Sequence, residues 1–135
     1  MKLKPLLIAA LAFASPALAQ DAEKAFFHGK TVRMVVGSGT GGGYDIFARL
    51  IAPYLGKALE ANVVVENQPG AGGITSLNRL YAAPADGLTM SFANGTSAAF
   101  AQITDQSGLR FDLVKFDYLA TVGAPPGDRK STRLN

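Results

Sequence analysis

The chain of 135 residues carries 13 Lys and Arg against 10 Asp and Glu, and 48% of its residues are hydrophobic. This length and composition are typical of one modest globular domain and exclude a disordered chain. The chain has no Cys, which excludes disulfides, a lipoprotein anchor and metal binding by thiolates. Most of the excess positive charge lies at the two ends of the sequence. The body between them is close to neutral, which excludes the basic surface that a nucleic-acid partner needs.

The N-terminus has the pattern of a secretory signal peptide. Lys2 and Lys4 precede an apolar run over residues 6–14, which leads to the small residues of Ala17-Leu18-Ala19. The apolar run is too short for the roughly 20 residues of a membrane-spanning helix. We therefore expect residues 1–19 to be removed by cleavage after Ala19, and the remaining chain to be exported to the periplasm.

Residues 32–59 predict a strand, a glycine-rich loop and a helix in that order. Residues 32–36 are almost entirely apolar, which is typical of a strand buried on both faces of a parallel sheet. Glycines fill most of residues 37–43, and we expect a helix to begin near Asp45. Pro53 should kink or split this helix, which ends by Asn62. Helical spacing predicts a broad buried face made of Ile46, Phe47, Leu50, Ile51, Tyr54, Leu55 and Leu59.

The same plan then repeats along the chain. Residues 63–66 predict a second buried strand, followed by a glycine-rich turn over residues 67–73 and a second helix. Residues 88–93 predict a third strand, followed by a polar loop and a short helix around residues 98–103. Residues 118–122 predict a fourth strand. This alternation predicts an α/β fold with a mostly parallel open sheet, flanking helices and right-handed crossovers.

Both glycine-rich turns open a helix at the same edge of the predicted sheet. Backbone N–H groups at such turns are accessible because glycine has no Cβ, and the positive end of the helix dipole favours a negative group. Open α/β sheets bind their ligands at this edge. The sequence therefore predicts a site for an anion, either a carboxylate or a phosphate.

A nucleotide-dependent oxidoreductase is the alternative interpretation of the first turn. Gly37, Gly39 and Gly42 match the G-x-G-x-x-G pattern, and Glu66 closes the second strand where such folds place a ribose-binding acid. An exported protein meets little NAD, however, and the fingerprint gives no role to the second glycine turn. We expect His28, the single His, to be a surface residue. With one His and no Cys, the chain offers neither a catalytic triad nor a zinc site.

Three segments resemble the signatures of a known family. They are Gly41-Gly42-Gly43-Tyr44-Asp45-Ile46-Phe47-Ala48-Arg49, Val64-Val65-Glu66-Asn67-Gln68-Pro69-Gly70-Ala71-Gly72-Gly73 and Ala85-Asp86-Gly87-Leu88-Thr89-Met90. Over about residues 30–123 the chain is similar to the substrate-binding proteins of tripartite tricarboxylate transporters, also called Bug proteins. The resemblance implies a monomeric periplasmic receptor of two lobes, a Venus flytrap, without catalysis, cofactor or metal. Such a receptor holds a small di- or tricarboxylate, or a related acid, between its lobes and delivers it to a membrane transporter.

The resemblance also implies which residues bind the ligand. The turns would offer backbone N–H groups, directly or through water, and the third loop would add hydroxyl donors. The implied set is Thr40, Gly41, Gly42, Gly43, Tyr44 and Asp45, then Asn67, Pro69, Gly70, Ala71, Gly72 and Gly73, and finally Thr96 and Ser97.

For four side chains near these turns, the sequence leaves more than one role possible. Asp45 would repel an anion, so capping the helix and fixing the loop is weighed against contact with a ligand hydroxyl, amine or bridging water. Asn67 either holds the turn or contacts the ligand. Tyr44 either covers the ligand or packs on the sheet. Arg49 either contacts the ligand, or is solvated or pairs with a neighbouring acid.

The chain also departs from the family pattern. The usual Pro-Phe-x-Pro lead-in is replaced by Gly37-Ser38-Gly39-Thr40, and Tyr44 stands where Ser or Thr often precedes the aspartate. The identity of the acid therefore stays open. Family members are longer, so we expect residues 20–127 to form part of the first lobe only. Residues 128–135 are expected to be a non-native or disordered tail.

Overall fold

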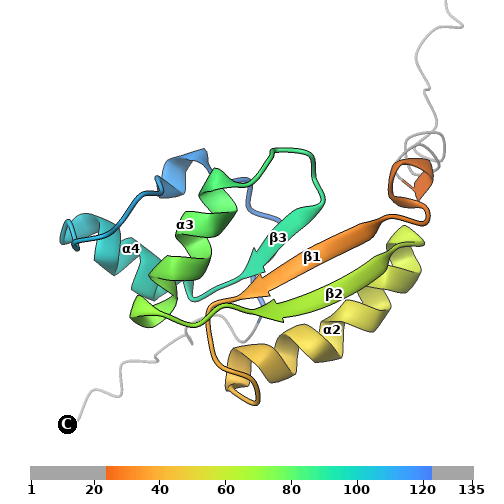
Figure 1. The fold of residues 1–135 in the computed structure, drawn as a ribbon, viewed down its shortest axis with the longest axis horizontal. Helices are drawn as coiled ribbons and strands as arrows, with labels where there is room; N and C mark the ends of the chain where they lie inside the picture. Colours follow the sequence, from red (N-terminus) through yellow and green to blue (C-terminus); the bar gives the residue numbers. More distant parts are fainter. Residues whose placement is uncertain (1–23, 123–135) are drawn as a thin grey trace, which may run out of the picture.

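The computed structural model describes residues 24–122, so the predicted signal peptide and tail lie outside the described residues. Three strands, β1 (Thr31–Val36), β2 (Asn62–Asn67) and β3 (Thr89–Phe92), form a sheet in the order β2-β1-β3. Both pairings are parallel, and the three arrows point the same way in Figure 1. The predicted α/β fold with a parallel open sheet is confirmed.

Helices cover both faces of this sheet. α2 (Gly43–Leu59) follows β1, α3 (Ile74–Ala82) follows β2 through the short 3-10 turn η1 (Ala71–Gly73), and α4 (Gly95–Ile103) follows β3. α2 and α3 lie on opposite sides of the sheet (Figure 1). This arrangement follows from the strand order, because β2 and β3 lie on opposite sides of β1 and crossovers of one hand then place their helices on opposite faces.

The strands differ in burial because of their places in the sheet. β1 is central, and Val32, Val35 and Val36 are at most 2% exposed. β2 is an edge strand among the described residues, and none of its residues is fully buried. The prediction of a buried second strand is therefore wrong. β2 lies at the edge of the sheet, where only one side of the strand has a neighbouring strand, so its apolar residues are only partly buried.

α2 meets the sheet with small residues. Its buried positions are Asp45, Ala48, Ala52 and Gly56, whose spacing of three or four residues gives one narrow face. Small side chains let the helix lie close to the strands, and a Cβ at Gly56 would already lie 3.6 Å from Val63 Cγ2 of β2. The predicted broad face is therefore wrong for four large residues, which are 50–73% exposed: Ile46, Phe47, Leu50 and Tyr54. The proline inside α2 does not split the helix.

A second apolar cluster joins α3, α4 and the segment that follows. Its buried members are Ile74, Leu77, Ala98, Ala101 and Phe111. The segment contains a 3-10 turn, η2 (Leu113–Lys115), and no strand is found over residues 118–122. The predicted fourth strand is thus wrong for the described residues, because residues 118–122 do not pair with the edge strand β3 or with β2.

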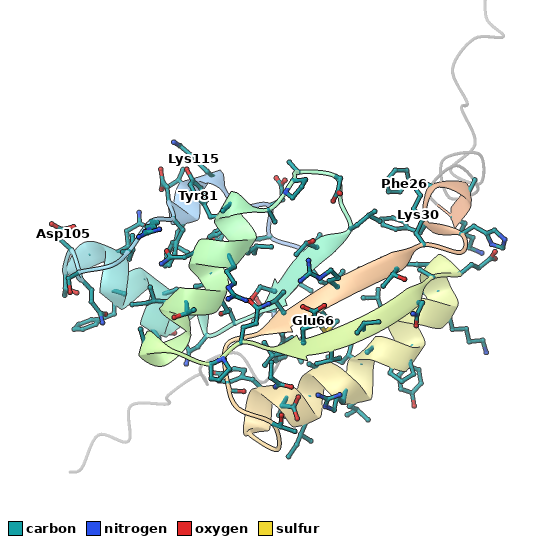
Figure 2. All side chains as sticks on the ribbon, in the orientation of Figure 1. Phe26, Lys30, Glu66, Tyr81, Asp105 and Lys115 are labelled. Atoms are coloured by element: carbon teal, nitrogen blue, oxygen red, sulfur yellow. The ribbon has the colours of Figure 1, made fainter. Side chains whose placement is uncertain are left out.

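The edge of the sheet where β1 begins carries exposed polar contacts. The Lys30 amine lies 3.5 Å from the centroid of the Phe26 ring, and the two side chains meet in Figure 2. His28 Nδ1 lies 3.1 Å from Glu60 Oε2, and the His28 side chain is 72% exposed. The prediction that His28 is a surface residue is confirmed.

Candidate functional site

The carboxyl ends of the three strands meet at one edge of the sheet. Val36, the last residue of β1, pairs with both Asn67 of β2 and Phe92 of β3. The loops that open α2, η1 and α4 therefore start from one line across the sheet. The prediction that the two glycine turns share one edge is confirmed.

We call residues 37–45, between β1 and the first turn of α2, the first corner. Gly41 has φ of 81°, and the Gly42 N–H donates to the Gly39 carbonyl oxygen at 3.1 Å. α2 begins without a side-chain cap. Within the described part of the chain, the N–H groups of Gly43 and Tyr44 therefore have no hydrogen-bond acceptor.

A buried carboxylate holds the first corner together. Asp45 is 2% exposed. Its Oδ2 accepts from the Gly41 N–H at 2.8 Å, and its Oδ1 accepts from Arg49 Nε at 2.9 Å and from Asn67 Nδ2 at 2.8 Å. The Gly41 N–H, followed by Arg49 and Asn67, lowers the pKa of Asp45 to about 2. Asp45 is thus ionised, and its charge faces the Arg49 guanidinium.

Asn67 ties this corner to the end of β2. Its Nδ2 also donates to the Ser38 carbonyl oxygen at 3.1 Å. Its Oδ1 accepts from Arg49 Nη2 at 2.9 Å and from Thr40 Oγ1 at 3.4 Å. Asn67 therefore joins the first corner to β2, and Arg49 pairs with the neighbouring acid Asp45. The sequence alone had left a second interpretation, contact with the ligand, open for both residues.

Residues 68–73 form a second corner, which depends on backbone conformation. Gly70, Ala71, Gly72 and Gly73 have φ of 146°, 46°, 65° and 99°. The Gly73 N–H donates to the Gly70 carbonyl oxygen at 2.9 Å and closes the turn. Ala71 adopts a left-handed φ as well, but φ values of 146° and 99° are easily adopted only by glycine, so this corner depends on Gly70 and Gly73.

The two corners touch each other at Gly37. A Cβ on Gly37 would lie 2.6 Å from Ser76 Oγ and 2.9 Å from Gly73 Cα. Ser76 is fully buried, and its hydroxyl donates to the Gly73 carbonyl oxygen at 2.7 Å. The contact places the two predicted turns side by side and explains why Gly37 must lack a side chain. Ser76 was missed at the level of sequence, because a single Ser in a helix carries no signal of its own.

The loop that follows β3 supplies the side chain that caps the N-terminus of α4. Asn94 precedes α4, and its Oδ1 accepts from the Ser97 N–H at 3.0 Å. Thr96 and Ser97 are exposed in the first turn of α4. The Tyr44 and Phe92 rings lie 6.0 Å apart, so Tyr44 packs against the end of β3 while staying 39% exposed.

Two buried polar atoms at this edge have no partner among the described residues. They are Ser38 Oγ in the first corner and Gln68 Oε1 in the second. Two hollows of the described chain lie away from the two glycine turns. One of about 590 Å³ lies between α2 and β2, near Pro53 and Val63, and another of about 350 Å³ lies on α3, near Asn78.

The Glu66 carboxylate is paired with Arg33 on one face of the sheet. Glu66 receives two hydrogen bonds from Arg33, at 2.9 Å from Nε and 2.7 Å from Nη2, and its carboxylate lies over β1 and β2 in Figure 2. The Arg33 hydrogen bonds lower the pKa of Glu66 and raise the pKa of Arg33. A ribose-binding acid needs free oxygen atoms, so this pairing weighs against a dinucleotide site.

Residues 24–122 contain no cluster of three or more His, Asp or Glu residues suited to a metal ion. No helix in the same range has both the length and the apolar character needed to span a bilayer.

The fold and this edge define an open α/β lobe of the kind that forms part of a periplasmic binding protein. No family model matches the chain. Among known proteins, a UPF0065 protein of Bordetella bronchiseptica is 35% identical over 86 residues, which are 64% of this chain and 25% of that protein. A UPF0065 protein from the gbd 5' region of Cupriavidus necator is 40% identical over 78 residues, 58% of this chain and 23% of that protein.

Protein BugT of Bordetella pertussis is 32% identical over 68 residues, which are 50% of this chain and 21% of BugT. The resemblance to the Bug proteins is therefore confirmed, and the chain is a relative of the UPF0065 and Bug proteins. The chain spans about a quarter of the length of these curated relatives.

Proposed function

We propose that the chain is part of the first lobe of an exported, periplasmic receptor for a small organic carboxylate, which delivers its ligand to a transporter of the tripartite tricarboxylate type. The observation that carries the proposal is the shared edge, where the two corners touch at Gly37 and where, among the described residues, the Gly43 and Tyr44 N–H groups have no acceptor. The relationship to the Bug proteins supports a receptor. The signal peptide that would direct export lies in residues 1–19.

Electrostatics at the edge support an anionic ligand. The N–H groups of Gly43 and Tyr44 stand at the positive end of the α2 dipole, a favourable place for a carboxylate oxygen. Arg49 offsets the negative charge of Asp45 at 2.9 Å, so Asp45 does not cancel this attraction. Thr96 and Ser97 are exposed and can add hydroxyl donors, while the Thr40 hydroxyl donates to Asn67 Oδ1 at 3.4 Å.

The exposure of the edge supports a second lobe that covers the ligand. Binding sites for small molecules bury most of the surface of their ligand, whereas Thr40, Gly43, Thr96 and Ser97 at this edge are exposed. The relatives are about four times as long as the matched segment, which leaves room for such a lobe. We therefore expect the 135-residue chain to bind carboxylates weakly.

A titration followed by the backbone amide signals of the chain tests the proposal. Succinate and citrate, added to about 20 mM at constant ionic strength, should shift the Gly43, Tyr44 and Gly72 signals, since amide shifts report even the weak millimolar binding expected of one lobe. Sodium chloride and NAD serve as controls. Shifts with NAD alone would support the oxidoreductase, and no shift with any carboxylate would contradict the receptor.

A further inference from the structure

We propose that Asp45, Arg49 and Asn67 are positioning residues that hold the first corner in its binding shape, and that Asp45 and Asn67 make no contact with the ligand. The proposal rests on the proposed function for the use of the corner, and on the hydrogen bonds of the three side chains for their role. It assigns ligand recognition at this corner to backbone N–H groups.

Asn67 has no hydrogen-bonding capacity left for a ligand. A carboxamide offers two N–H donors and an oxygen that accepts two hydrogen bonds. Both donors are used, toward Ser38 at 3.1 Å and Asp45 at 2.8 Å. The oxygen accepts from Arg49 at 2.9 Å and from Thr40 at 3.4 Å. All four positions are filled, and all four partners belong to the first corner or to α2.

Asp45 is closed to a ligand by burial as well as by bonding. Its side chain is 3% exposed, and three donors surround its two oxygen atoms. Arg49 spans the other two residues, because Nε bonds Asp45 and Nη2 bonds Asn67. The guanidinium fork therefore fixes the distance between the start of α2 and the end of β2.

This arrangement has a consequence for selectivity. A residue that touches a ligand hydroxyl or amine distinguishes malate or aspartate from succinate, which lacks that group. A residue that only sets the position of the corner changes the affinity for all these acids by the same factor. Substitution of Asn67 should therefore weaken malate and succinate equally.

The role is tested by amide hydrogen exchange in the ligand-free chain. In Asn67→Ala, the Gly41 N–H should exchange at least about tenfold faster, because its acceptor Asp45 loses a bond that fixes it. Asn78→Ala is the matched control, since Asn78 also joins two segments, through Gly108 at 2.8 Å and Arg110 at 2.8 Å. It should leave Gly41 exchange unchanged.

Arg49→Met provides a second variant should Asn67→Ala fail to fold, because the Arg49 side chain is 50% exposed. It should also speed Gly41 exchange, and Arg49→Lys should restore part of the protection. Unchanged Gly41 exchange in the folded variants overturns the positioning role. A loss of malate affinity larger than the loss of succinate affinity does so too. If no acid shifts any amide of the parent chain, the receptor proposal fails, while the exchange rates still decide the positioning role.

Discussion

The two corners at the carboxyl edge of the sheet are built by different means. The first corner is held by side chains, through the buried Asp45 and its partners. The second corner is held by its backbone, with four successive residues at positive φ. Both corners nevertheless present helix N-termini to the same edge. The comparison teaches that a glycine-rich turn in a sequence does not say what maintains its shape.

The glycines accordingly matter for different reasons in the two corners. In the first corner, a Cβ on Gly39 or Gly43 would meet no atom within 4 Å, so these positions have space. In the second, Gly72 also has space, yet its φ of 65° disfavours any side chain. The stability of glycine variants should therefore distinguish the first corner, which depends on side-chain contacts, from the second, which depends on backbone conformation.

Gly37→Ala should have the largest effect, because Gly37 is where the two corners meet. Its Cβ would lie 2.9 Å from the Gly73 Cα, a backbone atom that can move only with the whole second corner. Forcing the corners apart should lower the free energy of unfolding by about 2 kcal/mol or more, as overpacking does elsewhere. Urea unfolding of parent and variant measures this difference.

Gly39→Ala is the control for Gly37→Ala, because it adds the same methyl group to the same corner in open space. Its stability should stay within about 0.5 kcal/mol of the parent. Adding Ser76→Ala to Gly37→Ala removes the contact with Ser76 Oγ but keeps the contact with Gly73, so it should restore stability only in part. Equal stability of the two single variants would show that the corners are not in rigid contact.

Acid should weaken the first corner more than the second. The pKa of Asp45 is lowered from 3.8 to about 2, first by the Gly41 N–H and then by Arg49 and Asn67. A carboxyl with a lowered pKa in the folded state stabilises the fold fully above the unfolded value of 3.8, and this contribution is lost as the pH falls through about 2. The stability of Asp45→Asn should therefore decrease less than that of the parent between pH 4 and pH 2.

The difference between the two pH curves isolates Asp45, because the lowered pKa of Glu66 acts in both proteins. Asp105→Asn, at an exposed position near the end of α4 (Figure 2), controls for loss of one surface carboxylate. Stability measured by chemical denaturation at each pH gives the curves. Parallel curves for parent and Asp45→Asn would contradict a charged network in the first corner.

The sequence predicted the sheet and its edge, because apolar runs and glycine turns are local patterns. It could not predict which side of α2 meets the sheet. Large residues such as Leu50 and Tyr54 satisfy the same helical spacing as a buried face, while close approach selects Ala48 and Ala52 instead. The role of Asn67 also stayed open, since its four partners lie within residues 38–49, at least 18 residues away from it in the sequence.

The second corner gives the smallest predicted effects, and they have opposite signs. Gly72→Ala places a side chain at φ of 65° and should cost about 1 kcal/mol of unfolding free energy. Ala71 already has φ of 46°, so Ala71→Gly relieves strain and should be neutral or raise stability by up to about 1 kcal/mol. Urea unfolding measures both, with Gly43→Ala in α2 as a control expected to stay neutral or gain slightly. If Gly72→Ala were as stable as Gly43→Ala, the second corner would not depend on left-handed backbone, and the contrast between the corners would be lost.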